Sequence, residues 1–339
     1  MSLVQEYKSL KPYNSFGIDV RSRFFVEVFS EADLIKLLRS AIIHEHQLLV
    51  LGGGSNILFT QDYDGLVIKI SIPGIVSTPF NDDEVLVDAG AGVVWNDLVN
   101  YCVARKLAGV ENLSLIPGTV GASPIQNIGA YGVELKDVFY SCKAYEISSG
   151  QSRTFSFDDC RFGYRESIFK AELKNKYIIT SVTFRLSKKG QINTHYGAIK
   201  DELAKRNIVD PDIADISSVV AAIRVSKLPD PSTIGNAGSF FKNPLIDQTQ
   251  FQELVIQFPG MVNFPAAGGK VKIAAGWLIE QCGFKGKVVG NTGTWKNQAL
   301  VLVNHGGATG QEVYSFSEHI INTVNAKFGI TLEREVNIL

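Results

Sequence analysis

The sequence predicts an α+β protein in three parts, and the order of its strand and helix patterns leads to this prediction. A β-α-β-β pattern opens the chain over residues 1–70, strands dominate residues 71–215, and helical patterns with a few strands fill residues 216–339. Strands and helices that occur in such runs are typical of α+β folds. A chain of 339 residues is long enough for two or three domains.

The first part begins with a strand pattern at Phe24–Phe29. Ser30 is an expected helix N-cap because Asp33 stands three positions later and apolar residues then recur at helical spacing. Short strands are expected at Leu48–Leu51 and Leu66–Ile70, and three glycines follow the first of them.

The second part should hold one amphipathic helix, which begins near Trp95. Its expected strands are Val85–Ala89, Val138–Ile147, Arg153–Phe157 and Ile178–Leu186. From Ser187 to about Asp215 the chain is polar, and we expect a connection there with Tyr196 in a loop.

The third part shows apolar residues at helical spacing in several places. Helices are expected at Ile216–Ser226, Gln248–Phe258 and Ile273–Cys282, the last followed by a C′ glycine, Gly283. Thr309 and Glu312 predict a capping box for a helix that ends at Gly329. Strands are expected at Ala299–Val303 and Leu332–Val336.

Composition narrows the possible partners. The formal net charge is −1, so nothing drives long-range attraction to nucleic acid. The four cysteines form no CxxC pair and have no histidine at zinc spacing, which favours reduced thiols and no metal. Because no apolar run reaches the length of a signal peptide core or a membrane span, we expect a cytoplasmic protein without membrane partners.

Two glycine-rich loops are the candidate ligand sites. The first, Leu51–Leu58, has the sequence LGGGSNIL, and either a tight turn or a backbone phosphate cradle explains it. The second, Pro117–Gly132, reads PGTVGASPIQNIGAYG and favours binding of a pyrophosphate and a ring by main-chain amides. Dinucleotide signatures fail because Ile57 and Trp95 stand where a third glycine belongs, and Val288 breaks the Walker A pattern.

Together these loops resemble the FAD-binding signature of the UDP-N-acetylenolpyruvoylglucosamine reductase (MurB) family, in its longer form with a tyrosine loop. The resemblance extends through RFGYRES at 161–167, KLPDP at 227–231, GNAGSFFKNP at 235–244 and EREV at 333–336. It implies a flavin fold of the vanillyl-alcohol-oxidase (PCMH) type in two lobes, residues 1–70 and 71–215. Residues 216–339 would form a substrate-binding domain whose C-terminal strand returns to the active site.

The resemblance also implies non-covalent FAD and NADPH as the hydride donor, and no histidine lies in either loop to attach the flavin. The implied cofactor-binding residues are Leu51, Gly52, Gly53, Gly54, Ser55, Asn56, Ile57, Leu58, Pro117, Gly118, Thr119, Gly121, Ala122, Ser123, Pro124, Gln126, Asn127, Gly129 and Tyr131.

The implied reaction makes UDP-N-acetylmuramate, a cell-wall precursor, from UDP-N-acetylglucosamine enolpyruvate. Flavin N5 gives a hydride to C3, and Ser239 is implied to give a proton to C2. Arg165 suits the developing enolate as a bidentate cation. Glu335 is implied to help hold the enol form, for which its carboxyl must be protonated or neutralised by a cation such as Arg165.

Substrate contacts carried over from the motifs are Tyr131, Tyr164, Arg165, Tyr196, Lys227, Asn243 and Gln298. Lys227 suits a diphosphate, and Tyr196 could close over the uridine. The basic residue and tail that commonly follow the Glu-Val pair in this family are replaced by Asn337, Ile338 and Leu339, which puts the contact of that basic residue in doubt.

Two other functions remain open at this point. One is an FAD-dependent oxidoreductase of the same fold that acts on another sugar or alcohol, and the other is a non-catalytic sugar-nucleotide-binding protein. We expect a monomer whose only partner is its small-molecule substrate.

Overall fold

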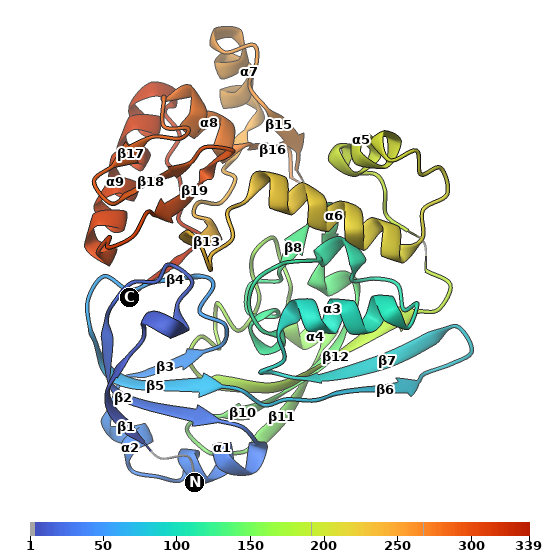
Figure 1. The fold of residues 1–339 in the computed structure, drawn as a ribbon, viewed down its shortest axis with the longest axis vertical. Helices are drawn as coiled ribbons and strands as arrows, with labels where there is room; N and C mark the ends of the chain where they lie inside the picture. Colours follow the sequence, from blue (N-terminus) through green and yellow to red (C-terminus); the bar gives the residue numbers. More distant parts are fainter. Residues whose placement is uncertain (1–3, 191, 267) are drawn as a thin grey trace. The chain divides into compact units, whose positions relative to one another are not determined.

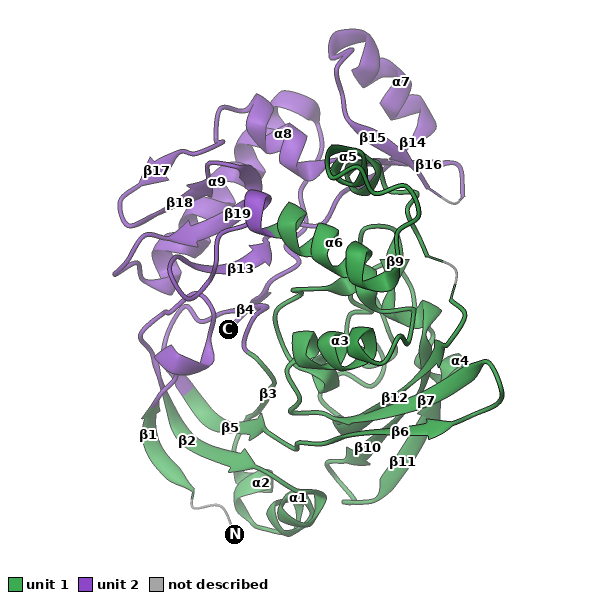
Figure 2. Ribbon diagram, turned by 45° about the vertical axis from the view of Figure 1, so that its right-hand side comes forward, with its two compact units in different colours: residues 1–8, 22–53, 64–224 green, residues 9–21, 54–63, 225–339 purple. Residues whose placement is uncertain are grey.

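The chain folds into two compact units, which Figure 2 colours separately. The computed structural model describes residues 4–190, 192–266 and 268–339. Unit 1 comprises Met1–Lys8, Ser22–Gly53 and Asp64–Arg224, and unit 2 comprises Ser9–Arg21, Gly54–Tyr63 and Val225–Leu339. The three-domain division at residues 70 and 215 stays a prediction.

Unit 1 begins with a four-stranded sheet and two short helices (Figure 1). The strand order is β1 (Gln5–Ser9), β2 (Arg21–Val28), β5 (Tyr63–Ile70) and β3 (Leu48–Leu51), and the helices are α1 (Glu31–Leu38) and α2 (Ile42–Glu45). Ser30 caps α1, because its hydroxyl accepts a hydrogen bond from the Asp33 amide at 3.1 Å. The predicted β-α-β-β unit and its N-cap are therefore confirmed.

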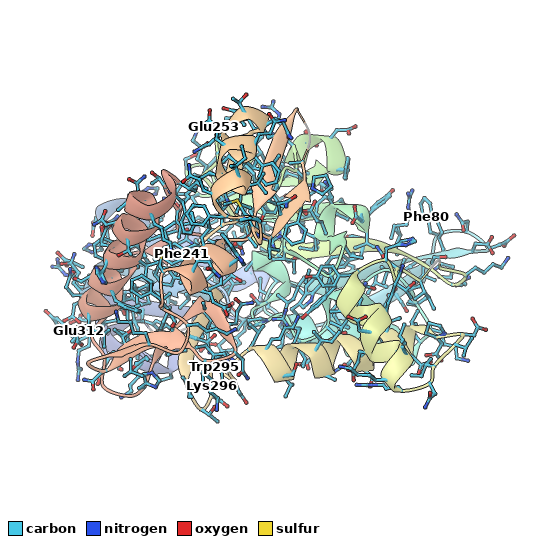
Figure 3. The ribbon with its side chains drawn as sticks, turned by 90° about the horizontal axis from the view of Figure 1, so that it is seen from above. Phe80, Phe241, Glu253, Trp295, Lys296 and Glu312 are labelled. Carbon is cyan, nitrogen blue, oxygen red and sulfur yellow. The ribbon has the colours of Figure 1, made fainter. Side chains whose placement is uncertain are left out.

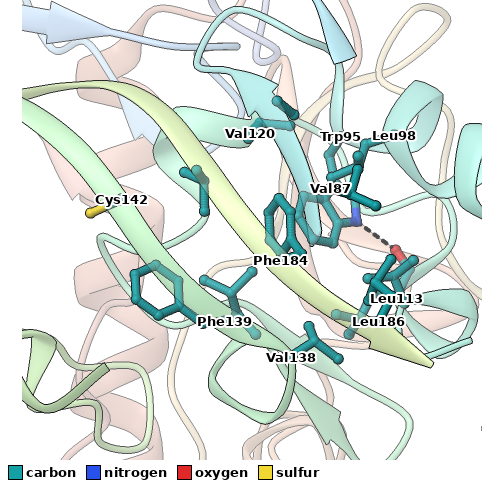
Figure 4. Packing of buried hydrophobic residues seen from close by; sticks show 14 of the residues in the cluster. Val87, Trp95, Leu98, Leu113, Val120, Val138, Phe139, Cys142, Phe184 and Leu186 are labelled. Carbon is teal, nitrogen blue, oxygen red and sulfur yellow. Dashed lines mark hydrogen bonds between the residues drawn. The ribbon is translucent and has the colours of Figure 1, made fainter. Parts of the chain in front are cut away.

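A five-stranded antiparallel sheet forms the rest of the unit 1 framework. Its order is β11 (Ser152–Ser156), β10 (Phe139–Glu146), β12 (Tyr177–Ser187), β7 (Glu84–Gly90) and β6 (Ile75–Pro79). Helix α3 (Trp95–Ala104) packs on it through Trp95, whose ring meets Phe184 edge to face at 5.8 Å. The Trp95 indole also donates to the Leu113 carbonyl at 2.9 Å, the dashed line in Figure 4.

Unit 1 also departs from the sequence prediction in two places. Phe157 does not end a strand but begins α4 (Phe157–Cys160), because Ser156 and Asp159 form a capping box there. The polar connection also contains a helix that was not predicted, α5 (Gly197–Lys205), which begins just after Tyr196. Ile199 and Leu203 bury one side of α5 against α6 (Ile213–Lys227), and two large apolar residues in nine give too weak a periodic signal.

Unit 2 is built on a four-stranded antiparallel sheet, β13 (Gly235–Ser239), β19 (Gln298–Asn304), β18 (Thr292–Trp295) and β17 (Val288–Val289). Helices α8 (Ala275–Gln281) and α9 (Gly310–Phe328) pack on it. A smaller sheet, β14 (Leu245–Asp247), β16 (Lys270–Ile273) and β15 (Asn263–Pro265), carries α7 (Gln248–Gln257). The remaining pairs are β4 (Ile57–Leu58) with β20 (Asn337–Ile338), and in unit 1 β8 (Gly129–Ala130) with β9 (Val133–Glu134).

The ends of the C-terminal helix were predicted correctly. Thr309 and Glu312 form the reciprocal capping box of α9, and Figure 3 labels Glu312 near this end of the helix. Gly329 closes α9 with a φ of 64°. The strand predicted at Leu332–Val336 was wrong, because Arg334 makes only a single antiparallel bridge to Phe241 and β20 begins at Asn337.

Every helix in the described part of the chain is too short or too polar to span a lipid bilayer.

A polar cluster around Glu31 ties α1 to the five-stranded sheet. The Glu31 carboxylate accepts hydrogen bonds from Lys143 at 2.6 Å, Tyr145 at 3.0 Å and Thr180 at 2.9 Å. Partial burial would raise the pKa of Glu31, but these three donors outweigh it and the pKa is lowered. The charged form of Glu31 is therefore the form that stabilises the fold.

We predict that Glu31→Gln lowers the free energy of unfolding by about 1 kcal/mol at pH 7, since the carboxylate is partly exposed. Because the folded pKa is lowered, the stabilisation is complete above the ordinary value of 4.5 and is lost as the pH falls through the lower folded pKa. Urea unfolding from pH 3 to pH 8 measures the difference. Glu172→Gln, which removes an exposed ion pair with Arg161, should change stability little.

Candidate functional site

The two glycine-rich loops touch each other within unit 1. A Cβ atom added to Gly53 would lie 2.7 Å from Gly118 Cα, and one added to Gly52 would lie 2.6 Å from Thr119 Oγ1. Real Cβ atoms do not approach other atoms this closely, so glycine is required at both positions. The loops therefore meet backbone to backbone.

Unsatisfied polar groups line this contact. The Thr119 hydroxyl is buried without a hydrogen-bond partner, and the Gly53 amide donates to no group in the described residues. Other amides of the second loop are bonded to a neighbouring segment, since Val120 donates to the Val93 carbonyl and Gly121 to the Ala91 carbonyl. The loop is thus rigid, and the donors left at the contact suit phosphate oxygens. This donor set fits the pyrophosphate of FAD.

The remainder of the first loop belongs to unit 2. Gly54 has a φ of 62°, and a side chain there would overlap the Tyr13 carbonyl. Asn56 donates from Nδ2 to the Glu335 carbonyl at 3.2 Å, and its own carbonyl accepts from the Asn337 amide at 3.1 Å. The predicted flavin loop and the predicted catalytic glutamate are therefore neighbours in unit 2.

Arg165 lies against the second loop in unit 1. Its Nη2 atom donates to the Gly129 carbonyl at 2.7 Å, and its guanidinium lies 5.5 Å from the centre of the Tyr164 ring. Arg165 has a φ of 55°, a strained conformation for a residue other than glycine. The arginine is half-buried and oriented rather than freely solvated.

Tyr131 and Tyr196 also come together in unit 1. Their ring centres are 5.3 Å apart and nearly perpendicular, and the Arg224 side chain is hydrogen-bonded to Tyr131. Burial raises the pKa of the Tyr131 hydroxyl, although the Arg224 charge opposes the shift. Arg224 was missed by sequence reasoning. It stands one helical turn before Lys227, and no motif distinguished it from other helix arginines.

Ser239 and Glu335 lie beside each other on the backbone of unit 2. The Glu335 amide donates to the Phe240 carbonyl at 2.9 Å, and Ser239 pairs with Val301 of β19 next to a register shift. Gly238, with a φ of 69°, turns the chain just before the serine. The Ser239 residue is exposed, and its hydroxyl bonds to no other described residue.

Two of the other predicted substrate residues of unit 2, Asn243 and Gln298, lie at the first turn of α8. Asn243 Oδ1 accepts from the Ala275 amide at 2.9 Å, and a Cβ at Gly276 would lie 2.8 Å from Gln298 Oε1. Asn297, next to Gln298, donates to the Ser226 carbonyl beside exposed Lys227. Lys227, Asn243 and Gln298 are thereby placed in one region.

Unit 1 also contains a cavity of about 550 Å³. Its walls include Lys136, Tyr140, Phe157 and Arg185, and none of the residues predicted to bind cofactor or substrate lines it.

Two family models and several full-length relatives match the chain. The family model described as UDP-N-acetylenolpyruvoylglucosamine reductase, C-terminal domain, matches residues 230–339, and an FAD binding domain model matches residues 22–156. The chain is 49% identical over 337 residues to the UDP-N-acetylenolpyruvoylglucosamine reductase of Flavobacterium johnsoniae, with 99% of each chain covered. Its identity to that of Pseudomonas aeruginosa is 50% over 339 residues, with 100% of each covered.

The fold is similar to the crystal structure of UDP-N-acetylenolpyruvylglucosamine reductase (MurB) from Thermus caldophilus. The TM-score is 0.68 at 22% identity, over 100% of this chain and 99% of that chain. The expected flavin fold with a C-terminal domain is therefore confirmed, and the chain binds FAD.

We predict that Gly53→Ala weakens FAD binding at least tenfold, because the methyl group forces the two loops apart. The purified variant should carry less yellow flavin per chain, measured by absorbance and by titration of the apoprotein with FAD. Gly260→Ala is the matched control, since nothing lies within 4 Å of an added Cβ there. Equal flavin content in folded Gly53→Ala and wild type would contradict the phosphate-cradle interpretation.

Proposed function

This chain belongs to the UDP-N-acetylenolpyruvoylglucosamine reductase family, and from that premise we propose its reaction. It is an FAD-dependent oxidoreductase that reduces the enolpyruvyl double bond of UDP-N-acetylglucosamine enolpyruvate to the lactyl ether of UDP-N-acetylmuramate. The product is a precursor for peptidoglycan. The observation that carries the proposal is the backbone contact between the loops at Gly53 and Gly118.

When bound, FAD would supply the redox chemistry, a hydride relay from NADPH through N5 to C3 of the enolpyruvyl group. The protein's task is to hold the reactants and to stabilise charge. The amides of the two glycine-rich loops would hold the pyrophosphate. Arg165, Ser239 and Glu335 are the residues proposed to act on the substrate.

Arg165 is the proposed partner of the substrate carboxylate. Hydride addition at C3 pushes electrons toward that carboxylate, and a fixed guanidinium stabilises the resulting negative charge. The bond from Arg165 to the Gly129 carbonyl supports this role, because it fixes the guanidinium before substrate arrives. Little reorganisation is then needed during the reaction.

Ser239 is the proposed proton donor to C2, and Glu335 the proposed partner that holds the enol form. An exposed hydroxyl without a protein acceptor is available to a substrate, which supports the assignment of Ser239. The two residues are proposed to act at the same place. This is supported by the bond from the Glu335 amide to the Phe240 carbonyl, which holds the backbone of residue 335 next to that of residue 240, and by the bond from Asn56 to the Glu335 carbonyl.

The nucleotide-sugar is the proposed ligand of the remaining polar and aromatic groups. Lys227 is a point charge for the diphosphate, and Asn243 and Gln298 are hydrogen-bonding amides around α8. Tyr131, Tyr164 and Tyr196 provide aromatic surface, and Tyr196 serves as a lid over the uridine. The proposed form is a cytoplasmic monomer, and its four free thiols, three of them buried, suit a reducing compartment.

The test is oxidation of NADPH by the purified yellow protein. We predict that UDP-N-acetylglucosamine enolpyruvate drives this oxidation stoichiometrically and that mass spectrometry finds a product heavier by two hydrogens. UDP-N-acetylglucosamine, which lacks the double bond, is the control. A flavin that NADPH reduces but the enolpyruvate does not reoxidise would point to another substrate.

We predict that Ser239→Ala leaves flavin reduction by NADPH intact and slows flavin reoxidation by the enolpyruvate by about 10²–10⁴-fold, the usual contribution of a general acid. Stopped-flow absorbance separates the two half-reactions. Ser152→Ala, at an exposed serine of β11, should change neither rate. Unimpaired reoxidation in Ser239→Ala would remove the serine from the mechanism.

A further inference from the structure

Asn112 is a buried amide that joins two distant segments of unit 1. It lies in a 3₁₀ turn, Glu111–Leu113, and only 1% of its surface is exposed. Its Nδ2 atom donates to the Tyr131 carbonyl at 3.1 Å and to the Asn193 carbonyl at 3.0 Å. Both acceptors are carbonyl oxygens, so the amide nitrogen must face them, and both of its hydrogens are used.

Asn193 also bonds to the turn at residues 131–132. Its Nδ2 atom donates to the Gly132 carbonyl at 3.2 Å, and its Oδ1 atom accepts from the His195 amide at 3.1 Å. Two asparagines thus bind consecutive carbonyls of the second glycine-rich loop. Tyr131 and Gly132 have φ values of 50° and 81°, so these bonds hold a left-handed turn that is unfavourable at the tyrosine.

The turn determines where two of the proposed substrate tyrosines lie. Tyr131 points its ring at Tyr196 at 5.3 Å, and Tyr196 follows Asn193 by three residues before α5 begins. Within the described residues, hydrogen bonds through Asn112 and Asn193 join the 131–132 turn to the 193–196 segment, and the two tyrosine rings add a direct contact. The Asn112 Oδ1 atom is buried and has no hydrogen-bond partner among the described residues, so the two bonds donated by Nδ2 must offset the cost of that oxygen.

We infer that Asn112 is a positioning residue for the nucleotide-sugar, because it holds the Tyr196 segment against Tyr131. This role rests on the proposed function, in which both tyrosines contact the substrate. An aspartate at position 112 would have no N–H group to donate to the Tyr131 and Asn193 carbonyls. An alanine there would likewise leave both carbonyls without this donor.

The test compares Asn112→Ala with wild type as FAD-loaded enzymes. The KM for UDP-N-acetylglucosamine enolpyruvate should rise roughly tenfold, the size expected for loss of a buried hydrogen-bonded pair. The rate of flavin reduction by NADPH without substrate should stay unchanged. Hydrogen exchange followed by mass spectrometry should become faster across residues 193–200 in the substrate-free enzyme.

Asn96→Ala is the matched control. Asn96 Oδ1 accepts from the Leu115 amide at 2.8 Å, so this variant loosens the end of the same turn without touching Tyr131 or Asn193. It should leave KM and the exchange of residues 193–200 as in wild type. A folded Asn112→Ala with wild-type KM overturns the inference, whether or not exchange changes.

Two further measurements keep the inference testable. If Asn112 acts through Tyr196, Asn112→Ala should raise the KM much less in a Tyr196→Ala background than in the wild-type background. Additive effects of the two substitutions on the KM would overturn the inference.

If Asn112→Ala does not fold, Asn193→Ala takes its place, because it removes the bond to Gly132. This variant should still raise the KM and speed hydrogen exchange across residues 193–200, and an unchanged KM and exchange rate would overturn the inference. Should the wild type fail to reduce the enolpyruvate, the proposed function fails, and the exchange data alone decide whether Asn112 holds the segment.

Discussion

The contact on which the structure depends is the approach of one backbone loop to another, with no side chain between them. At Gly53 and Gly118 the main chains are so close that a single methyl group must move one of them. Such a contact leaves amide hydrogens as the chief functional groups of the surface, which is the arrangement that binds phosphate oxygens. The glycines of both loops are therefore explained by geometry rather than by flexibility.

The same reliance on main-chain bonds continues in unit 2. The Glu335 backbone is held through its amide and carbonyl, by Phe240 and Asn56. The Ser239 backbone is held by the pairing of β13 with β19, and its hydroxyl bonds to no other described residue. Main-chain bonds therefore fix the positions of both residues to which the proposed function assigns a role, and such fixed positions are what proton transfer requires.

Local patterns predicted the elements whose signals are local. The N-cap at Ser30, the capping box at Thr309 and the glycine stop at Gly329 depend on residues within one turn of each other, and all are found. Helix α5 was missed because its stability comes from burial against α6, which the spacing of nine residues does not reveal. The strand expected at Leu332–Val336 failed because pairing depends on a distant partner, Phe241, which meets it at one bridge only.

For the site, the motifs indicated residues with distinctive chemistry but not those that orient them. Arg224 and Asn112 belong to no motif quoted above, yet one bonds the Tyr131 side chain and the other its carbonyl. Asn112 would be an ordinary polar residue by sequence, and only its burial shows that its donors are committed. Since a buried amide with an unsatisfied oxygen lowers stability, its cost must be offset by what it holds. What it holds is a left-handed tyrosine whose ring faces Tyr196, so the unpaired amide oxygen and the backbone strain occur together at this one turn.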